Sequence, residues 1–509
     1  MRPLTLVVCA LAIAPSTAQA ALSGFGPTSL AHGFPLWYAD AAGFKVAPCL
    51  EAKVLDVGGQ LMKPCMTLEP VPGSPLSFPQ NFGVEEMYWS ADALAVFSST
   101  QGGLPFGAPG DVTVSMALVA SFPALVVAEG QQVVFARLRV RANVPMTGTY
   151  RITHPFGPMD YAVSGVGGGR EINHNQEIGN FVSPGRTGDY SLALLDGPAP
   201  PLPGEVGPPP KVDVLDRSIG PFLLPAATPP FLEALNGDLY LAIPQTIVNG
   251  LVVPLEQPIT GSPVGQNFVR LELLNPPLGF ALNGAAGTNV VETTGFSVSG
   301  KVFRDDPAPQ PPVANPDRGG TTIGVAVDID VLANDTDPGS LHFIDPQGLG
   351  LGAAPPYAIA ATTPHGTVVR RTATATGRSS FVYTPAPGFT GTDSFSYVVQ
   401  DTGGLISAPA TVSVIVEDLK IVRAALRLRH LRFAVSGTTS EPFGPDLAPN
   451  VIRVHAGPDA TGALLAQATV AADGSWACAG AFEVKQSWRS VTVVSANSTA
   501  IKNVPLSLR

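Results

Sequence analysis

The stretch FVYTPAPGFTGTDSFSYVVQDTGG, residues 381–404, decides the fold of this chain. Phe395 and Tyr397 alternate with serines, so the two aromatic side chains face one side of a strand and the serines face the other. A turn-rich crossover precedes this strand at 385–391, and DTGG at 401–404 is typical of a hairpin turn after it. The pattern predicts a half-buried β-strand whose aromatic face lies in a core.

The same alternation, with a period of two residues, recurs along the chain. It appears at 112–118, at 323–331 and at 412–416, and no stretch has a 3.6-residue period over three turns. With 54 Gly and 52 Pro among 509 residues, turns are frequent, while 45% hydrophobic residues exclude a disordered or collagen-like polymer. We therefore predict an all-β chain in which tandem β-sandwich modules follow a larger N-terminal β region.

Pro-rich segments predict the domain borders. GPAPPLPGEVGPPP at 197–210 is expected to be a linker or loop, and RDDPAPQPPVANP at 304–316 a linker. A third border falls at 417–420, where an alternating strand runs into charged residues. The expected parts are a signal peptide at 1–20, an N-terminal β domain at 21–196, a second β subdomain at 211–303, a third module at 317–418 and a C-terminal β domain at 420–509.

The third module resembles a known kind of repeat. Residues 312–418 contain VLANDTDP at 331–338, TPHGTV at 363–368 and ATVSVIV at 410–416, together with the stretch at 381–404. In this they resemble the bacterial immunoglobulin/cadherin-like tandem repeat of large secreted and surface proteins. The resemblance implies an immunoglobulin-like β-sandwich. The C-terminal domain, with GSWACAG at 474–480, looks like another immunoglobulin-like module.

The N-terminal region resembles a second group. Its pieces include HGFPLWYADAAGFKVAPCL at 32–50, EEMYWSADA at 85–93 and ITGSPVGQNFVRLE at 259–272. Through these, residues 22–303 resemble a family of uncharacterised secreted bacterial proteins. The resemblance implies a unit of this size and carries no known activity.

The first twenty residues predict export. Arg2 precedes an apolar run of about eleven residues, and Ala18-Gln19-Ala20 has the small-x-small pattern of a cleavage site. The run is shorter than the roughly 20 residues that a membrane span needs, and no later segment qualifies. We expect cleavage after Ala20, a secreted or cell-surface location and no membrane span.

Three cysteines follow that segment. In an oxidising compartment Cys49 and Cys65 can form a disulfide that closes a loop of about 16 residues, worth roughly 3 kcal/mol. The alternative is a metal pair, which lacks a nearby His or Cys to complete a zinc set. Cys478 is left over, either as a buried free thiol or as half of an intermolecular bridge.

Charge and motifs exclude several classes of function. The net charge is −10 with no basic run, so nucleic acid is not an expected partner. Arg137, Arg139 and Arg141 alternate with apolar residues and are expected on a solvated strand face. There is no G-x-S-x-G, none of the seven His is followed by Glu, and the P-loop-like spacing at 295–301 lies on an alternating strand. We expect no catalytic residues.

Two sets of residues remain as candidate binding sites. Asp335, Asp337, Asp393 and Asp401 lie in loops of the third module, and calcium takes six to eight oxygen ligands. The resemblance to cadherin-like modules implies calcium as a cofactor, although Asp also caps turns. Exposed Trp37 and Trp89 could stack on sugar rings, whereas the alternative is packing in the core.

These observations favour a secreted or surface-associated modular protein with an adhesion, matrix or structural spacer role and no enzymatic activity. Its partner would be an extracellular protein or a glycan surface. The alternative is an exported carbohydrate-binding or carbohydrate-active protein that uses its N-terminal region.

Overall fold

The computed structural model divides the chain into two compact units. Unit 1 comprises Met1–Thr28, Phe34–Pro70 and Gly83–Arg304, and unit 2 comprises Ser29–Gly33, Val71–Phe82 and Asp305–Arg509. The expected signal peptide 1–20 and the Pro-rich segment 197–210 lie outside the described residues. The structure describes residues 22–508 except 52–54, 58–59, 63, 66–69, 124, 179–186, 191–192, 194–219, 228–229, 235–237, 242–244, 249–250, 255, 307–308, 340–341, 374–376, 428–431, 445–447, 482–489 and 498.

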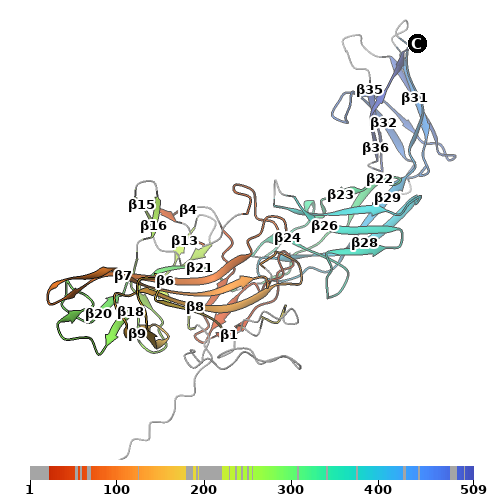
Figure 1. The fold of residues 1–509 in the computed structure, drawn as a ribbon. Coiled ribbons are helices and arrows are strands. Elements are labelled where there is room, and N and C mark those ends of the chain that lie inside the picture. Colours follow the sequence, from red (N-terminus) through yellow and green to blue (C-terminus); the bar gives the residue numbers. More distant parts are fainter. Residues whose placement is uncertain are drawn as a thin grey trace, which may run out of the picture. The chain divides into compact units, whose positions relative to one another are not determined.

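The main sheet of unit 1 has the strand order β1–β2–β3–β21–β6–β7–β8–β11 (Figure 1). At its centre lies the antiparallel hairpin of β6 and β7, strands of 17 and 18 residues. Its strands are β1 (Leu22–Phe25), β2 (Tyr38–Asp40), β3 (Lys45–Ala47), β6 (Glu85–Gln101), β7 (Leu104–Ser121), β8 (Val133–Asn143), β11 (Ile172–Ile178) and β21 (Ser297–Val302), joined by β13 (Leu232–Glu233), β14 (Leu239–Tyr240) and β19 (Phe280–Ala281).

A second sheet of unit 1 has the order β10–β9–β18–β20. Strands from both sides of 197–210 share the two sheets, because β18 pairs with β9 and β21 pairs with β6. This corrects the predicted division of the region into domains 21–196 and 211–303. The strands are β9 (Gly148–His154), β10 (Gly157–Val163), β18 (Val269–Leu274) and β20 (Val290–Thr293), beside the pairs β4 (Leu55–Val57) with β5 (Gln60–Met62), β12 (Leu224–Pro225) with β17 (Ile259–Thr260) and β15 (Gln245–Val248) with β16 (Leu251–Pro254).

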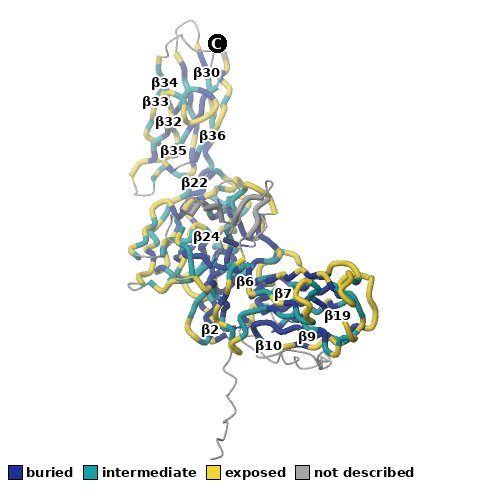
Figure 2. The backbone as a smooth tube through the Cα atoms, turned by 90° about the vertical axis from the view of Figure 1, so that its left-hand side faces the viewer, coloured by how far each residue is buried: buried dark blue, intermediate teal, exposed yellow. Residues whose placement is uncertain are grey.

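The core of unit 1 follows the alternation in the sequence. Val112, Val114, Met116 and Leu118 of β7 are all buried, as their spacing predicts. Buried residues occur along most of β6 and β7, whereas the residues at the tip of this hairpin, near β19, are exposed (Figure 2).

Arg137 on β8 departs from the predicted solvated face. Its side chain is only 7% exposed and forms ion pairs with Glu85 at 2.7 Å and Glu177 at 2.9 Å. The two acids come from β6 and β11, so the polar face of the strand is covered by carboxylates from other strands of the same sheet. The prediction of solvent exposure was wrong for this residue because alternation cannot show what covers a polar face.

The third module, in unit 2, consists of two four-stranded sheets with the orders β22–β29–β28–β24 and β23–β27–β26–β25. Its core contains Phe381, Tyr383 and Tyr397, with Phe395 at its margin, so the predicted aromatic face of 391–401 is confirmed. The elements are β22 (Asp317–Thr322), β23 (Val327–Ile329), the 3-10 helix η3 (Val331–Ala333), β24 (Ile344–Leu351), β25 (Ala360–Thr363), β26 (Gly366–Thr372), β27 (Ser379–Pro385), β28 (Gly391–Asp401) and β29 (Ala410–Glu417).

The predicted continuous strand at 323–331 was wrong. Strand β22 ends at Thr322, and Gly324 has a positive φ of 71°, a left-handed conformation that favours glycine and turns the chain. Val325 in this turn is 52% exposed, although it belongs to the same alternating series as buried Ile329.

The C-terminal module also consists of two four-stranded sheets, with the orders β34–β31–β30–β37 and β33–β32–β35–β36. Trp476 and Cys478 of β34 face its core. The strands are β30 (Lys420–Arg427), β31 (Arg432–Thr438), β32 (Val451–Ala456), β33 (Leu464–Thr469), β34 (Ser475–Ala481), β35 (Ser490–Ser495), β36 (Ala500–Pro505) and β37 (Ser507–Leu508). Together the modules confirm the predicted all-β class with β-sandwich modules.

Two early segments of the chain belong to unit 2 through hydrogen bonds to the third module. In Ser29–Gly33, the backbone N–H of Leu30 donates to Gln400 Oε1 at 2.6 Å. In Val71–Phe82, the backbone oxygen of Leu76 accepts from Gln347 Nε2 at 2.7 Å.

We predict that Arg137→Ala destabilises unit 1 by about 3 kcal/mol, since it leaves Glu85 and Glu177 facing each other without their shared cation. Arg151→Ala is the matched control, because Arg151 pairs with Asp160 on an exposed face. Urea unfolding of the two variant chains measures both effects. Equal losses of stability in the two variants would contradict the structural role of the buried pair.

Candidate functional site

The four predicted calcium ligands do not converge. Asp393 and Asp401 lie near the two ends of β28, eight residues apart, which is about 26 Å in an extended strand. Asp393 accepts hydrogen bonds from Tyr383 OH at 2.8 Å, from the backbone N–H of His365 at 3.2 Å and from the Thr363 hydroxyl. Desolvation raises the pKa of Asp393, but these hydrogen bonds lower it by more, so the net pKa lies below its ordinary value. The side chain stabilises a turn.

Asp337 and Asp401 lie close enough to interact electrostatically. Desolvation first, and then the charge of Asp337, raise the pKa of Asp401. Asp401 Oδ1 accepts the backbone N–H groups of Gly403 and Leu405, and Asp337 Oδ1 accepts that of Gly339. These are the turn-capping contacts that were the alternative to calcium binding.

Asp335 belongs to a different cluster, around the hydroxyl of Tyr397. Within 3.1 Å of this hydroxyl lie Asp317 Oδ2, Asp335 Oδ1 and the backbone oxygen of Asn315. Burial raises the pKa of Asp317 to about 6, and the charge of Asp335 adds to this rise. Burial also raises the pKa of Asp335. One hydroxyl hydrogen cannot satisfy several acceptors, so a proton on one carboxyl relieves the cluster.

The cysteines behave as the disulfide interpretation predicts. Cys49 and Cys65 form a disulfide. Together with Glu51 they are the one group of three His, Cys, Asp or Glu side chains in the described residues whose ligand atoms lie within 4.8 Å of one another. Because both sulfurs are in the disulfide, they are not thiolate ligands. Cys478 is a buried free thiol whose pKa burial raises to about 11.

The two tryptophans differ. Trp89 is fully buried, and its indole N–H donates to the backbone oxygen of Leu223 at 3.1 Å. The prediction of an exposed stacking side chain is therefore wrong for Trp89, because its position in β6 faces the core. Trp37 is half-buried, with Lys45 Nζ 4.4 Å from its ring centre.

Two histidines of the chain are buried and neutral near neutral pH. Desolvation lowers the pKa of His154 to about 3, with a smaller effect from His174. Desolvation likewise lowers the pKa of His32 to about 3, with a smaller effect from Arg370. Neither side chain has the pKa near 7 that suits general acid–base catalysis.

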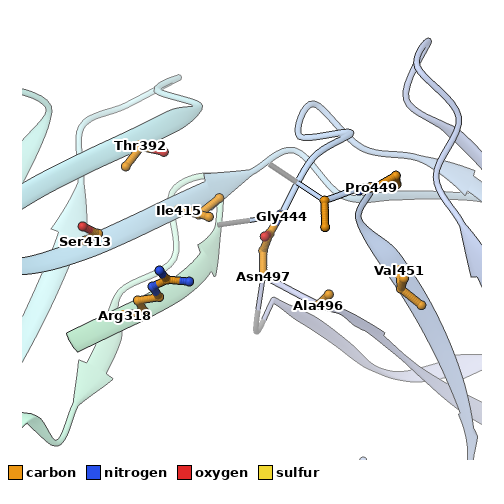
Figure 3. A pocket seen from close by; sticks show the side chains of 11 residues that line it. Arg318, Thr392, Ser413, Ile415, Gly444, Pro449, Val451, Ala496 and Asn497 are labelled. Carbon is orange, nitrogen blue, oxygen red and sulfur yellow. The ribbon is translucent and has the colours of Figure 1, made fainter. Parts of the chain in front are cut away.

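The candidate functional site is a pocket of about 560 Å³ at the junction of the third and C-terminal modules (Figure 3). Arg318, Thr392, Ser413 and Ile415 line it from the β22–β29–β28 sheet. Its lining among the described residues includes no His, Cys, Asp or Glu. The lining from the C-terminal module is Gly444, Ala448, Pro449, Val451, Ala496 and Asn497.

Sequence reasoning missed this site. Its residues lie between positions 318 and 497 and meet only because two modules adjoin. Arg318 and Asn497 have no motif around them, and polar residues between strands are ordinary in turns.

Two face-packed sheets with short strands define the third module as an immunoglobulin-like β-sandwich. Residues 309–415 match the family model described as "Bacterial Ig domain", so this part of the chain is similar to bacterial immunoglobulin domains. No curated protein matches the chain. Within the described part of the chain, no helix has the length and apolar character to cross a membrane.

Solved structures give weak likenesses. The teleost fish polymeric Ig receptor ectodomain is 10% identical over 38% of this chain and 98% of that chain, with a TM-score of 0.15. Drosophila N-cadherin EC1-4 is 9% identical over 52% of this chain and 64% of that chain, with a TM-score of 0.14. An endo-fucoidan hydrolase from glycoside hydrolase family 107 is 14% identical over 39% of this chain and 34% of that chain, with a TM-score of 0.18. These scores are too low to indicate a shared overall fold.

We predict that Asp317→Asn removes a pH dependence of the stability of unit 2. Because the folded pKa of Asp317 is about 6 and the ordinary value is 3.8, its contribution is present below about pH 4 and is lost as pH rises through about 6. The loss is about 1 kcal/mol after allowance for its partial exposure. Calorimetric melting of the full chain from about pH 4 to 7 measures it.

Asp418→Asn is the control, since it also removes one carboxylate from unit 2 and lies outside the Tyr397 cluster. A pH dependence that survives unchanged in Asp317→Asn would contradict the assignment.

Proposed function

We propose that this chain is a secreted or surface-associated modular protein with an adhesion, matrix or structural spacer role and no enzymatic activity. The observation that carries the proposal is the way each sandwich closes. In the third module the first strand β22 pairs in parallel with the last strand β29, from Asp317↔Val412 to Thr322↔Glu417. In the C-terminal module the first strand β30 pairs in parallel with β37.

Parallel pairing of first and last strands suits a module that bears tension. The chain enters such a module at one end of the pair and leaves at the other end. A pull on the two ends therefore acts along the strands and loads all the hydrogen bonds of the pair together. An antiparallel terminal pair would instead open one bond at a time. A spacer or adhesion protein between two surfaces meets this kind of load.

Further support comes from the site and the sequence. The bacterial immunoglobulin-like domain at 309–415 and the export pattern at 1–20 agree with a location outside the cell or on its surface. The junction pocket offers Arg318, hydroxyls and apolar side chains, a surface for binding an extracellular protein or glycan.

The mechanical role has a direct test. We predict that the third module resists a pull applied at residues 314 and 418 more strongly than a pull applied at 390 and 418, because residues 390 and 418 lie at the same open end of the antiparallel β28–β29 pair, and the second pull opens that pair one hydrogen bond at a time. Single-molecule force spectroscopy of the full chain, with handles at these positions, compares the unfolding forces. Equal forces in the two geometries would contradict the load-bearing role.

A second candidate function is an exported carbohydrate-binding or carbohydrate-active protein that uses its N-terminal region. The half-buried Trp37 favours it, because an indole that is partly accessible can stack on a sugar.

We predict that, if this second function holds, Trp37→Ala abolishes binding on a glycan array while the chain still melts as the parent does. Trp476→Ala is an unsuitable control because Trp476 is buried, so Val96→Ala, at an exposed apolar position of unit 1, serves instead. Glycan binding that is unchanged in Trp37→Ala, or absent in the parent chain, would remove this candidate.

A further inference from the structure

A buried carboxyl lies where the third and C-terminal modules meet. Glu417 is the last residue of β29, and its backbone oxygen accepts the N–H of Ile323 at 2.9 Å, so its main chain belongs to the third module. Its side chain is fully buried among polar side chains of the C-terminal module. These buried neighbours are Asn450, Ser495, Asn497 and Thr499.

Among the described residues, the three short hydrogen bonds to this carboxyl all go to one of its oxygens, and the Thr499 hydroxyl is a further, weaker donor to the carboxyl. Glu417 Oε1 accepts from Asn450 Nδ2 at 2.8 Å, from Ser495 Oγ at 2.8 Å and from Asn497 Nδ2 at 2.6 Å. The three donors come from a loop before β32 and from the end of β35 and the turn after it. The side chain of one module is therefore held by three donors of the next.

Two buried oxygens at this place have no hydrogen-bond partner among the residues that the structure describes. They are Glu417 Oε2 and the amide oxygen Oδ1 of Asn497. Both are acceptors when Glu417 is ionised, and a buried unpaired polar group is destabilising. The same amide already donates its nitrogen to Oε1 of the same carboxyl. A proton on Oε2 would turn that oxygen into a donor, and the acceptor without a partner is Oδ1 of the amide whose nitrogen already contacts the same carboxyl.

The charges around Glu417 favour the proton. Among the described residues no ion pair joins Glu417 to a cation, and Glu441 is the titratable group whose charge acts with it. Asp418, the next residue, is paired with Lys420. Arg318 lies with Asn497 in the pocket lining (Figure 3). Desolvation raises the pKa of Glu417 above its ordinary value of 4.5, although the amide and hydroxyl donors act against the rise.

We propose that Glu417 is held in its neutral form and donates Oε2–H to Asn497 Oδ1, so that an acid–amide pair locks the C-terminal module to the third module. Loss of this proton leaves two acceptors facing each other and adds a charge beside Glu441. The junction is then weakened, and Asn497, which lines the pocket, loses one of its two contacts with Glu417. The lock is a pH-sensitive device beneath the junction pocket.

The sign of the pH dependence follows from linkage. A raised pKa in the folded state means that the contribution to stability is complete below the ordinary glutamate value of 4.5 and is lost as pH rises through the raised value. The junction is therefore strongest in acid and weaker in alkaline solution.

The test uses the full chain in the Asp317→Asn background, so that Asp317 does not add its own pH dependence. Glu417→Gln keeps the shape and replaces the acid O–H by an amide N–H that can donate to Asn497. We expect calorimetric melting of this background to fall with rising pH, and the fall to be smaller in Glu417→Gln, in which only the titrations of groups such as Asp335 and Asp401 remain. Glu441→Gln is the matched control, which removes a junction carboxyl but leaves Glu417 titrating, so melting still falls with rising pH, although removal of the Glu441 charge shifts the fall toward lower pH.

A second measurement detects the proton itself. Infrared spectra with ¹³C-labelled glutamate carboxyls separate glutamate from aspartate, and we expect a protonated glutamate band above the ordinary pKa in the parent and in Glu441→Gln. Absence of that band overturns the proposal, even if Glu417→Gln fails to fold. The proposal is also overturned if the melting temperature depends on pH in the same way in the parent and in Glu417→Gln. Calcium-dependent stabilisation that Glu417→Gln loses would assign the two oxygens to a cation and also overturn it.

Discussion

The closing of each sandwich by its own first and last strands is the interaction on which the rest of unit 2 depends. A buried strand satisfies most of its backbone N–H and C=O groups through neighbouring strands, so a module built from strands needs partners for its terminal segments as well. In the third module six consecutive pairs along β22 and β29 meet this need. The last of these pairs, Thr322↔Glu417, fixes the main chain at the point where the C-terminal module begins.

The buried ionisable side chains of the chain are stabilised in three different ways, which depend on the ion-pair and hydrogen-bond partners beside each of them. Arg137 is neutralised by two carboxylates, Asp393 is stabilised in its charged form by four hydrogen bonds, and Glu417 accepts its three short hydrogen bonds on one oxygen. The pKa of Asp393 is lowered and that of Glu417 is raised, although desolvation is the largest cause in both. The two carboxyls differ in their hydrogen bonds, because both oxygens of Asp393 accept hydrogen bonds, whereas the three short hydrogen bonds to Glu417 all go to one oxygen.

The sequence predicted what depends on local pattern and missed what depends on contact between distant segments. Alternation identified the buried face of β7 and the aromatic face of β28, because strand geometry alone decides which side chains share a face. Alternation failed at 323–331, because the left-handed Gly324 places a turn between β22 and β23 inside the alternating series. The sequence-based prediction also divided unit 1 at the Pro-rich segment 197–210, although strands from both sides of this segment share the same sheets. Local sequence does not show which strands pair with each other.

The residues at the junction of the third and C-terminal modules could not be predicted from local sequence pattern either, because they meet only through contact between distant segments. Asn450 and Asn497 are the residue types expected in turns, and nothing around Glu417 marks it as buried. Only the approach of two modules puts the carboxyl beside amide donors and removes it from water. A calcium ion in the same place would need six to eight oxygen ligands. The three groups that contact Glu417 Oε1 instead direct donor hydrogens toward it, and these would repel a cation. A proton would need only two oxygens, Glu417 Oε2 as its donor atom and Asn497 Oδ1 as the acceptor.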